Sequence, residues 1–359
     1  MRYYTHYKHL VRMLPPKGYG KDALSRMLAR HRVRSGAVCL FDEKGVTHTA
    51  VVGNAQKKVK ATEDTFFRTA SVSKMVCAMM ALQLSEQGKL DMDADAAQYL
   101  GIPLRNPQYR NQVITPRMLL CHTSSLVDSD AFWQGAKTGK PLEQVLQGNV
   151  FSAHRPGTHF AYSNFGAGVL GAVLEGASHK SLDALLKEVF PFTEASFYPQ
   201  NLPSDCVLAD CGDILPPRVQ YDAKALQRRS KAENRAEPLR HYAVGHGNLC
   251  IRAKDLAWIG IRAMTGFEKL REAQIPFGAR DPYITEGLGM FIVNDAALCS
   301  NTVYGHQGLA YGAVNGVFFD PVQKKGFVLL TGGASVARKY VLADLNRDLI
   351  MYVLGGKAE

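Results

Sequence analysis

The residue pair best suited to chemistry in this sequence is a serine followed by a lysine, in the segment Ser71-Val72-Ser73-Lys74. A serine hydroxyl is a weak nucleophile until a neighbouring base takes its proton. Residues three apart lie on one face of a helix, so Lys74 can reach the hydroxyl of Ser71. At the start of a helix the serine also meets backbone N–H groups that lack a partner within the helix. The spacing therefore predicts that Ser71 is a nucleophile and Lys74 its base. The structural alternative is that Ser71 only caps the helix.

Three later segments also concentrate polar and aromatic side chains close to glycine or proline. The first holds a histidine followed by hydroxyl residues, the second a tyrosine and an asparagine after a Pro-Gly pair, and the third a histidine between glycines. In chain order they read Leu119-Leu120-Cys121-His122-Thr123-Ser124-Ser125-Leu126, then Arg155-Pro156-Gly157 with Phe160-Ala161-Tyr162-Ser163-Asn164, then Tyr304-Gly305-His306-Gln307-Gly308.

Taken together, the four segments resemble the motifs of the serine β-lactamase and penicillin-binding-protein superfamily. They are most similar to the branch that holds class C β-lactamases, D-Ala-D-Ala carboxypeptidases, D-aminopeptidases and related esterases. In that branch S-x-x-K, L-L-x-H-T-S-G-L, P-G-x-x-F-x-Y-S-N and H-x-G follow one another. The similarity extends from about Leu24 to Leu354. It implies an α+β fold of the β-lactamase/transpeptidase type, in which an antiparallel sheet is flanked by helices and a mostly helical region is inserted.

The resemblance also implies how these residues act, through an acyl-enzyme on Ser71 that needs no metal and no organic cofactor. Lys74 and Tyr162 would accept and relay the proton of Ser71, with Tyr162 acting either as a phenolate or in concert with Lys74. The Asn164 amide would hold Lys74 and a substrate carbonyl. The substrate-binding strand would contribute His306, Gln307, Gly308 and Leu309, the last through a backbone N–H that stabilises the oxyanion together with that of Ser71.

Departures from the family pattern bear on the substrate. His306 stands where β-lactamases carry lysine, and Gln307 where threonine or serine often helps to bind a carboxylate. A cation at His306 would favour an ionised Tyr162 and an anionic substrate. Leu309 replaces a usually small residue, and its side chain is expected to crowd or line the pocket. We expect a small-molecule or short-peptide substrate: a small ester, a D-amino-acid amide or a D-Ala-type peptide, rather than a β-lactam. A β-lactamase or penicillin-binding D-Ala-D-Ala carboxypeptidase is the first alternative, and a non-catalytic sensor of β-lactams or peptides is the second.

Two other segments imitate these motifs. Lys137-Thr138-Gly139 matches the K-T-G of β-lactamases, but it precedes Tyr162 and is predicted to lie in a polar loop. Tyr109-Arg110-Asn111 is a second Y-x-N that lacks the Pro-Gly lead. Neither segment is expected to belong to the site, and His122 is expected to have a structural role.

The elements that must hold these residues can be predicted from the periodicity of apolar residues. Residues 71–87 are apolar on nearly every side, which predicts a helix buried in the middle of the protein. Strands are expected near both ends of the chain, so we predict a sheet domain from residues 17–89 and 245–359 and an inserted, mostly helical domain, 90–244. Residues 1–16 would form a basic arm, and 216–240 a basic surface loop that is partly helical. Further helices are predicted at 21–32, 116–121, 142–146, 166–175, 182–189 and 336–354, and strands at 36–41, 46–52, 287–293, 302–308, 312–319 and 326–331.

Composition indicates a globular protein, because 46% of the residues are apolar and only 21% are charged. The formal net charge is +11, and residues 1–34 hold nine Lys or Arg against Asp22 alone. This basic segment could contact an anionic surface weakly, but no nucleic-acid-binding motif accompanies it, so no nucleic-acid partner is expected. No apolar run is long enough for a membrane-spanning helix or a secretory signal, which predicts a cytoplasmic protein. The seven cysteines form no C-x-x-C pair and H-E-x-x-H is missing, so no metal site is expected.

Overall fold

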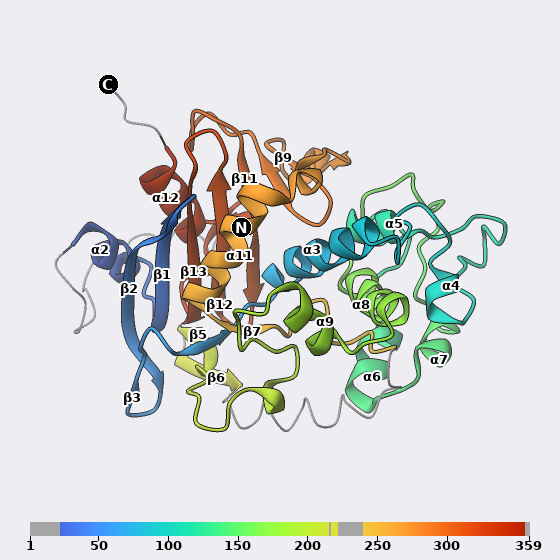
Figure 1. Cartoon of the computed structure of the whole chain (residues 1–359), viewed down its shortest axis with the longest axis horizontal. Coiled ribbons are helices and arrows are strands. Elements are labelled where there is room, and N and C mark those ends of the chain that lie inside the picture. The colour runs from blue at the N-terminus through green and yellow to red at the C-terminus, as the bar shows by residue number, and fades with distance from the viewer. Residues whose placement is uncertain (1–21, 215–216, 222–239, 356–359) are drawn as a thin grey trace, which may run out of the picture.

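The computed structural model describes residues 22–214, 217–221 and 240–355, and its centre is a nine-stranded sheet (Figure 1). The strand order is β3-β2-β1-β13-β12-β11-β10-β9-β8, and each neighbouring pair is antiparallel. The fold is therefore of the α+β type that the sequence predicts. The strands of this sheet are β1 (Ser35–Asp42), β2 (Gly45–Gln56), β3 (Val59–Lys60), β8 (Ile275–Pro276), β9 (Ile284–Glu286), β10 (Phe291–Val293), β11 (Val303–Ala310), β12 (Ala313–Asp320) and β13 (Lys325–Gly333).

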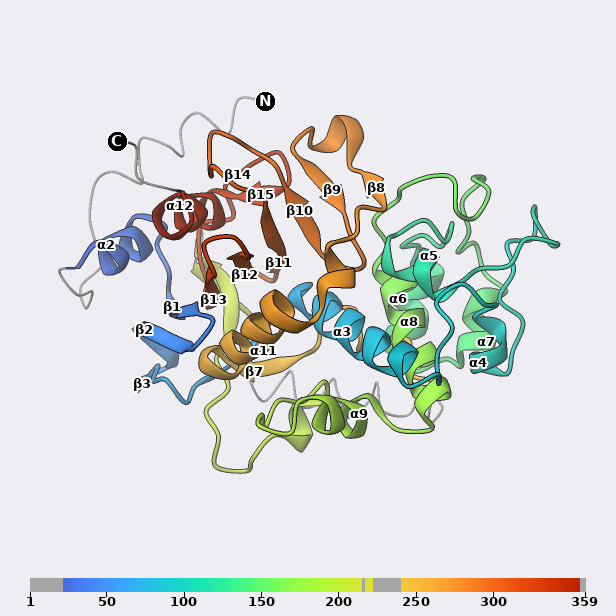
Figure 2. The ribbon, with the colours of Figure 1, turned by 45° about the horizontal axis from the view of Figure 1, so that its top comes forward.

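Helices cover both faces of the sheet, as Figure 2 shows. On one face, α2 (Ala23–Arg30) and α12 (Asp344–Val353) pack against the strands in one core cluster. On the other face, α3 (Val72–Glu86) and α11 (Ala253–Gly266) belong to a larger cluster that continues into the helical region. Every residue of β12 is buried, since this central strand has apolar neighbours on both faces.

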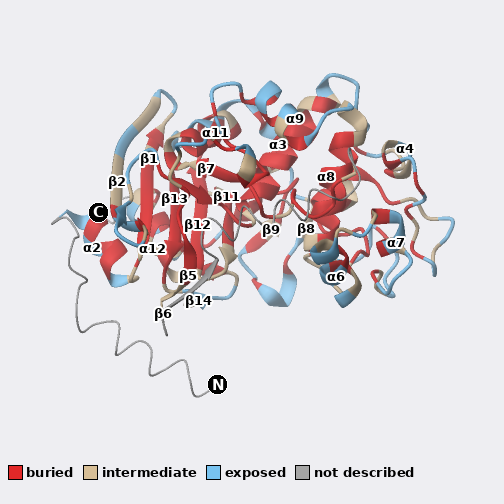
Figure 3. Ribbon diagram, turned by 90° about the horizontal axis from the view of Figure 1, so that it is seen from below, coloured by how far each residue is buried: buried red, intermediate tan, exposed pale blue. Residues whose placement is uncertain are grey.

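The helix α3 links the sheet to the helical region. It begins beside the sheet and ends among the helices of residues 97–189 (Figure 1). Figure 3 shows that α3 and α8 are buried along most of their length, which explains why both sequences are apolar on nearly every side. The helices of this region are α4 (Ala97–Leu100), α5 (Pro116–Leu120), α6 (Asp130–Thr138), α7 (Leu142–Leu146), α8 (Asn164–Ser178) and α9 (Leu182–Val189).

The remaining short elements connect the two regions or lie at the rim. Two strands, β4 (Phe66–Arg68) and β7 (Cys250–Arg252), pair next to the start of α3. The others are β5 (Cys211–Ile214) with β6 (Pro217–Tyr221), β14 (Arg338–Lys339) with β15 (Leu342–Ala343), and the 3-10 helices Pro199–Asn201, Glu268–Arg271 and Gly278–Arg280. Among the described residues, no helix combines the length and the apolar character needed to span a bilayer.

Most predicted elements are present, and the differences have physical causes. The helix predicted over 336–354 starts only at Asp344, because the preceding residues pair as β14 and β15. The strand predicted over 287–293 is confined to β10, since Gly289 turns the chain with a φ of 72°. Within the loop predicted at 216–240, residues 217–221 form strand β6, and 222–239 lie outside the described residues, as does the predicted arm 1–16.

Candidate active site

Ser71 occupies the position just before the first residue of α3. The chain leaves β4 and turns at Ala70, whose φ of 51° is in the left-handed region. The hydroxyl of Ser73 donates to the carbonyl of Ala70 at 2.7 Å and accepts the N–H of Leu249 at 3.2 Å, which fixes this turn. The side chain of Ser71 makes no capping hydrogen bond. The alternative in which Ser71 only caps the helix is therefore wrong, and its hydroxyl is available for another role.

The amine of Lys74 lies against that hydroxyl. Its Nζ is 3.1 Å from Ser71 Oγ, 2.9 Å from Asn164 Oδ1 and 2.8 Å from the carbonyl oxygen of His246. Only 4% of Lys74 is exposed, and this burial lowers the pKa of its amine from 10.5 to about 7. A lysine with this pKa can receive a proton near neutral pH, as a general base must.

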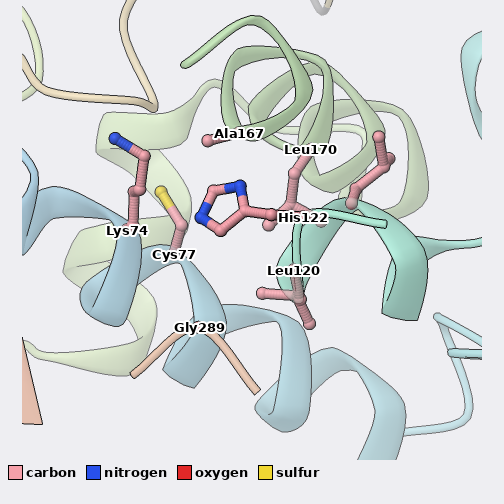
Figure 4. Close-up of a pocket in the computed structure, with 8 residues that line it drawn as sticks. Lys74, Cys77, Leu120, His122, Ala167, Leu170 and Gly289 are labelled. Atoms are coloured by element: carbon pink, nitrogen blue, oxygen red, sulfur yellow. The ribbon is translucent and has the colours of Figure 1, made fainter. Parts of the chain in front are cut away.

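A small cavity adjoins the inner side of Lys74 (Figure 4). Figure 4 shows the ring of His122 pointing into the space between Lys74 and the residues of α8. The residues around the cavity are all buried and mostly apolar, so no bulk water stabilises the charged amine from this side. The lining residues are Lys74, Cys77, Leu119, Leu120, His122, Ala167, Leu170 and Gly289.

Tyr162 lies beside Ser71 and Lys74. Its ring centroid is 4.9 Å from Lys74 Nζ, and the side chain of Ser71 is close enough to lower the pKa of its hydroxyl, against the larger effect of burial. Burial raises the pKa of this phenol above its ordinary value, so Tyr162 keeps its proton at neutral pH. Of the two roles expected for this tyrosine, the structure therefore favours a neutral relay in concert with Lys74 over a phenolate.

His122 supports the ring of Tyr162 from behind. The two ring centroids are 4.2 Å apart, and Nδ1 of His122 accepts the backbone N–H of Ser163 at 3.2 Å. Burial holds the pKa of His122 well below its usual range, so the imidazole is neutral. These contacts agree with the structural role expected for His122.

Two acidic residues that no sequence motif indicates, Asp128 and Glu286, raise the pKa of Lys74 against the larger effect of burial. Asp128 accepts the Asn164 side-chain amide at 2.7 Å and the backbone N–H of Phe165 at 2.9 Å, at the positive end of α8. This contact turns the Asn164 oxygen toward Lys74. Asp128 follows the His-Thr-Ser segment closely in the chain, but nothing in its spacing indicated the contact with Asn164.

The second acidic residue, Glu286 at the end of β9, is fully buried. Both of its carboxyl oxygens lack a hydrogen-bond partner among the described residues. Burial raises the pKa of Glu286 well above its usual range, although the charge of Lys74 opposes the shift. The neutral acid is the form that this environment favours.

Gly308 places strand β11 directly against the nucleophile. A Cβ on this residue would lie 2.1 Å from the carbonyl oxygen of Thr69 and 3.2 Å from the backbone nitrogen of Ser71. Only glycine allows this approach, because any side chain would overlap the backbone of Thr69.

The register of β11 and β12 determines which way the backbone N–H of Leu309 faces. Strands β11 and β12 are joined by the two-residue turn Tyr311-Gly312, in which both residues have positive φ. In such a hairpin Ala310 and Ala313 exchange the closing hydrogen bonds, and the N–H of the residue before them faces away from the partner strand. Strand β10 pairs with β11 only up to Gly305, so neither neighbouring strand pairs with the Leu309 N–H, which directly follows Gly308 in the chain.

His306 does not supply the cation that the sequence analysis considered. Its ring is 1% exposed and stacks on Phe291 with centroids 4.3 Å apart. Nδ1 donates to the carbonyl oxygen of Gln307 at 2.6 Å, while the buried Nε2 has no partner among the described residues. Burial lowers the pKa of His306 to about 3, so the imidazole is neutral and cannot act as an anion-binding charge at neutral pH.

Gln307 and Leu309 also differ from expectation. The Gln307 amide donates to the carbonyl of Val341 and accepts the N–H of Ala343 at 3.0 Å, so it fastens the segment before α12 instead of facing Ser71. The Leu309 side chain packs against the core cluster shared with α12, and it does not crowd the nucleophile. Alternate residues of a strand point to opposite faces, so Gln307 and Leu309 face α12 while Gly308 meets α3.

The two imitating segments lie away from these groups. Lys137-Thr138-Gly139 forms the end of α6, with Gly139 as its left-handed cap, and is not part of a strand. Tyr109-Arg110-Asn111 lies in turns before α5. The structure thus brings together Ser71, Lys74, Tyr162, Asn164 and the backbone of Gly308 and Leu309. In the described part of the chain, no group of three or more His, Cys, Asp or Glu is arranged to hold a metal ion.

Comparison with known proteins agrees with this arrangement. A family model described as Beta-lactamase matches residues 21–350. Protein flp of Staphylococcus aureus strain N315 is 29% identical over 154 residues, which are 42% of this chain and 29% of that protein. Esterase EstB of Burkholderia gladioli is 27% identical over 208 residues, 49% of this chain and 50% of the esterase. The matched region therefore spans half or less of the length of these curated relatives.

Solved structures show the same fold over nearly the whole chain. EstCE1, described as a hydrolase with promiscuous acyltransferase activity, superposes with a TM-score of 0.73 at 21% identity. The superposed region covers 91% of this chain and 97% of the EstCE1 chain. D-alanine carboxypeptidase AmpC from Burkholderia cenocepacia superposes with a TM-score of 0.66 at 18% identity, over 92% of this chain and 95% of the carboxypeptidase. D-amino acid amidase from Ochrobactrum anthropi SV3 superposes with a TM-score of 0.67 at 18% identity, over 92% of this chain and 96% of the amidase.

Proposed function

Since the chain belongs to the beta-lactamase family of serine hydrolases, we propose that Ser71 attacks an ester or amide carbonyl and forms an acyl-enzyme. The observation that carries this proposal is the amine of Lys74. It lies 3.1 Å from Ser71 Oγ, and burial brings its pKa to about 7. The hydroxyl therefore has a base in hydrogen-bond contact that is substantially unprotonated at neutral pH.

The acylation step follows from the contacts around Ser71. As Oγ bonds to the carbonyl carbon, its proton passes to neutral Lys74, and the developing oxyanion is stabilised by the N–H groups of Ser71 and Leu309. Asn164 holds the Lys74 amine in place through its side-chain oxygen. Neutral Tyr162, which lies beside Ser71 and Lys74, passes a proton to the leaving group and is reprotonated from Lys74. Water then releases the acyl group by the reverse sequence.

The substrate classes that we propose are a small ester, a D-amino-acid amide or a short D-Ala-type peptide, and among these an ester or amide without a carboxylate beside the scissile bond fits best. His306 is neutral and the Gln307 amide is already engaged, so neither offers the charge or hydroxyl that would bind a carboxylate beside the nucleophile. This argues against efficient β-lactam hydrolysis. The names of two similar proteins, an esterase and a D-amino acid amidase, point in the same direction.

Turnover of p-nitrophenyl acetate, combined with the intact mass of the protein, tests the proposal. The wild type should hydrolyse the ester and carry an acetyl group during turnover. Ser71→Ala should lose at least about a thousandfold in rate, show no acetyl adduct and unfold at the same temperature as the wild type. Residual turnover within about tenfold of the wild type in Ser71→Ala would contradict the role of Ser71.

The same mass measurement with benzylpenicillin separates the alternatives. A Ser71-dependent adduct that is released would indicate a β-lactamase, or a penicillin-binding carboxypeptidase if it is released slowly. An adduct in a protein that hydrolyses none of the esters, amides or D-Ala peptides would favour the non-catalytic sensor. Absence of an adduct, together with ester turnover, would agree with the esterase or amidase function.

A further inference from the structure

One side of the site carries an exposed tryptophan. Trp133 on α6 is 43% exposed, whereas the ring of Phe132, with its centroid 4.4 Å away, is completely buried. Single exposed hydrophobic side chains are common on protein surfaces, and Trp258 is equally exposed, at 44%. Trp133 differs from it because its ring contacts His246, whose carbonyl oxygen accepts Lys74 Nζ.

Two sets of contacts place Trp133 next to the reacting groups. The His246 ring meets the indole in an edge-to-face arrangement, with centroids 6.1 Å apart and planes at 78°, and the carbonyl of His246 accepts Lys74 Nζ at 2.8 Å. On the other side, Asp128 precedes α6 and accepts the Asn164 amide at 2.7 Å. The two residues that accept hydrogen bonds from Lys74 Nζ, Asn164 and His246, therefore both contact α6 or the residues just before it. His246 contacts Trp133 on α6, and Asn164 contacts Asp128.

The chemistry of this wall is apolar and aromatic. The His246 ring also meets Phe132 edge to face at 5.9 Å, and burial holds the pKa of His246 well below its usual range, so it is neutral. The nearby carboxylate of Asp128 is occupied by two N–H donors. A charged group would find no counter-ion on this wall, whereas an aromatic ring could stack on the indole.

We propose that Trp133 and His246 form an aromatic subsite that binds an apolar, planar group of the substrate, such as the phenyl ring of an aromatic ester or amide. The subsite rests on the proposed hydrolase function, since it deepens the substrate class of that site. It makes Trp133 a specificity-determining residue, with no part in proton transfer.

Matched substrate pairs test the subsite in catalysis. Trp133→Ala should lower kcat/KM for ethyl phenylacetate by about tenfold, while kcat/KM for ethyl acetate changes by less than about twofold. A second pair, benzyl acetate and ethyl acetate, carries the aromatic ring on the alcohol side of the ester. If the subsite binds that side, Trp133→Ala should lower kcat/KM for benzyl acetate but not for ethyl acetate. Trp258→Ala is the control, because Trp258 is also exposed, at 44%, but lies on α11 and faces strand β2 at Gly45. A selective loss for the aromatic member of either pair supports the subsite, and equal losses in both pairs overturn it.

Binding without turnover provides a second readout, because the chain has only two tryptophans. In Ser71→Ala/Trp258→Phe all tryptophan fluorescence comes from Trp133. Phenylacetamide should change this fluorescence in a saturable way, whereas acetamide should not. The counterpart Ser71→Ala/Trp133→Phe, which keeps Trp258, should respond to neither. An unchanged Trp133 signal with phenylacetamide would overturn the subsite, and this result does not depend on whether the protein hydrolyses anything.

Discussion

Lowering the pH through neutrality should switch off acylation of Ser71, because Lys74 accepts a proton only as the neutral amine. Burial lowers the pKa of Lys74 to about 7, so roughly nine-tenths of the amine is neutral at about pH 8 and one-tenth at about pH 6. The rate constant should therefore fall about tenfold over this interval. A lysine with its ordinary pKa of 10.5 would be neutral in less than about one molecule in a thousand at neutral pH.

The assay is kcat/KM for p-nitrophenyl acetate between about pH 5.5 and 9, which reports ionisations of the free enzyme. Absorbance is read at the wavelength where both forms of nitrophenol absorb equally, and circular dichroism checks that the fold persists at the acidic end. Asp128→Asn is the informative variant, because the Asp128 carboxylate raises the pKa of Lys74. Its removal should move the midpoint to lower pH. A flat profile, or a wild-type midpoint above about pH 9, would refute Lys74 as the base.

Three further substitutions address the remaining groups. Asn164→Asp should move the acidic limb to higher pH, since a carboxylate 2.9 Å from Lys74 Nζ would stabilise the ammonium form; an unmoved limb in the same assay would argue against this contact. Gly308→Ala should lose at least about a hundredfold in kcat/KM and about 1–3 kcal/mol of stability in urea unfolding, because its Cβ would meet backbone at 2.1 Å. Gly266→Ala, where no atom lies within 4 Å of the added Cβ, is the control and should change neither quantity. Gln307→Leu should cost about 1–3 kcal/mol in the same unfolding assay but leave KM within about twofold, and a large rise in KM with unchanged stability would restore Gln307 as a substrate-binding residue.

Much of the fold follows from local sequence patterns. The hairpin of β1 and β2 turns where Asp42 accepts the N–H groups of Lys44 and Gly45 at 2.7 and 3.1 Å, so the turn residues themselves determine its position. Helix α3 follows from an apolar run on every face, and its observed bounds, Val72–Glu86, nearly match the prediction. Elements of this kind depend on neighbours in the chain, which is why periodicity identifies them.

Elements that depend on distant contacts were predicted less well. The residues before α12 were predicted to be helical, yet they form β14 and β15, and the Gln307 amide holds them through Val341 and Ala343. Asp281 adds a bond to the N–H of Val341 at 3.2 Å. Gln307 is 34 positions from Val341 and 36 from Ala343, and Asp281 is 60 positions from Val341, so no local pattern could indicate these contacts.

The sequence by itself determined that the proposed nucleophile and its base lie together. Ser71 and Lys74 are three positions apart at the head of one helix, and helical geometry alone brings their side chains together. Only the tertiary structure decided their charge states and partners. Asn164 reaches Lys74 from 90 positions away, and burial by distant segments makes Lys74 a base, keeps Tyr162 protonated and leaves His306 neutral. The physical reason is that the pKa of a buried group depends on desolvation and on charges brought near by folding, which adjacent residues do not specify.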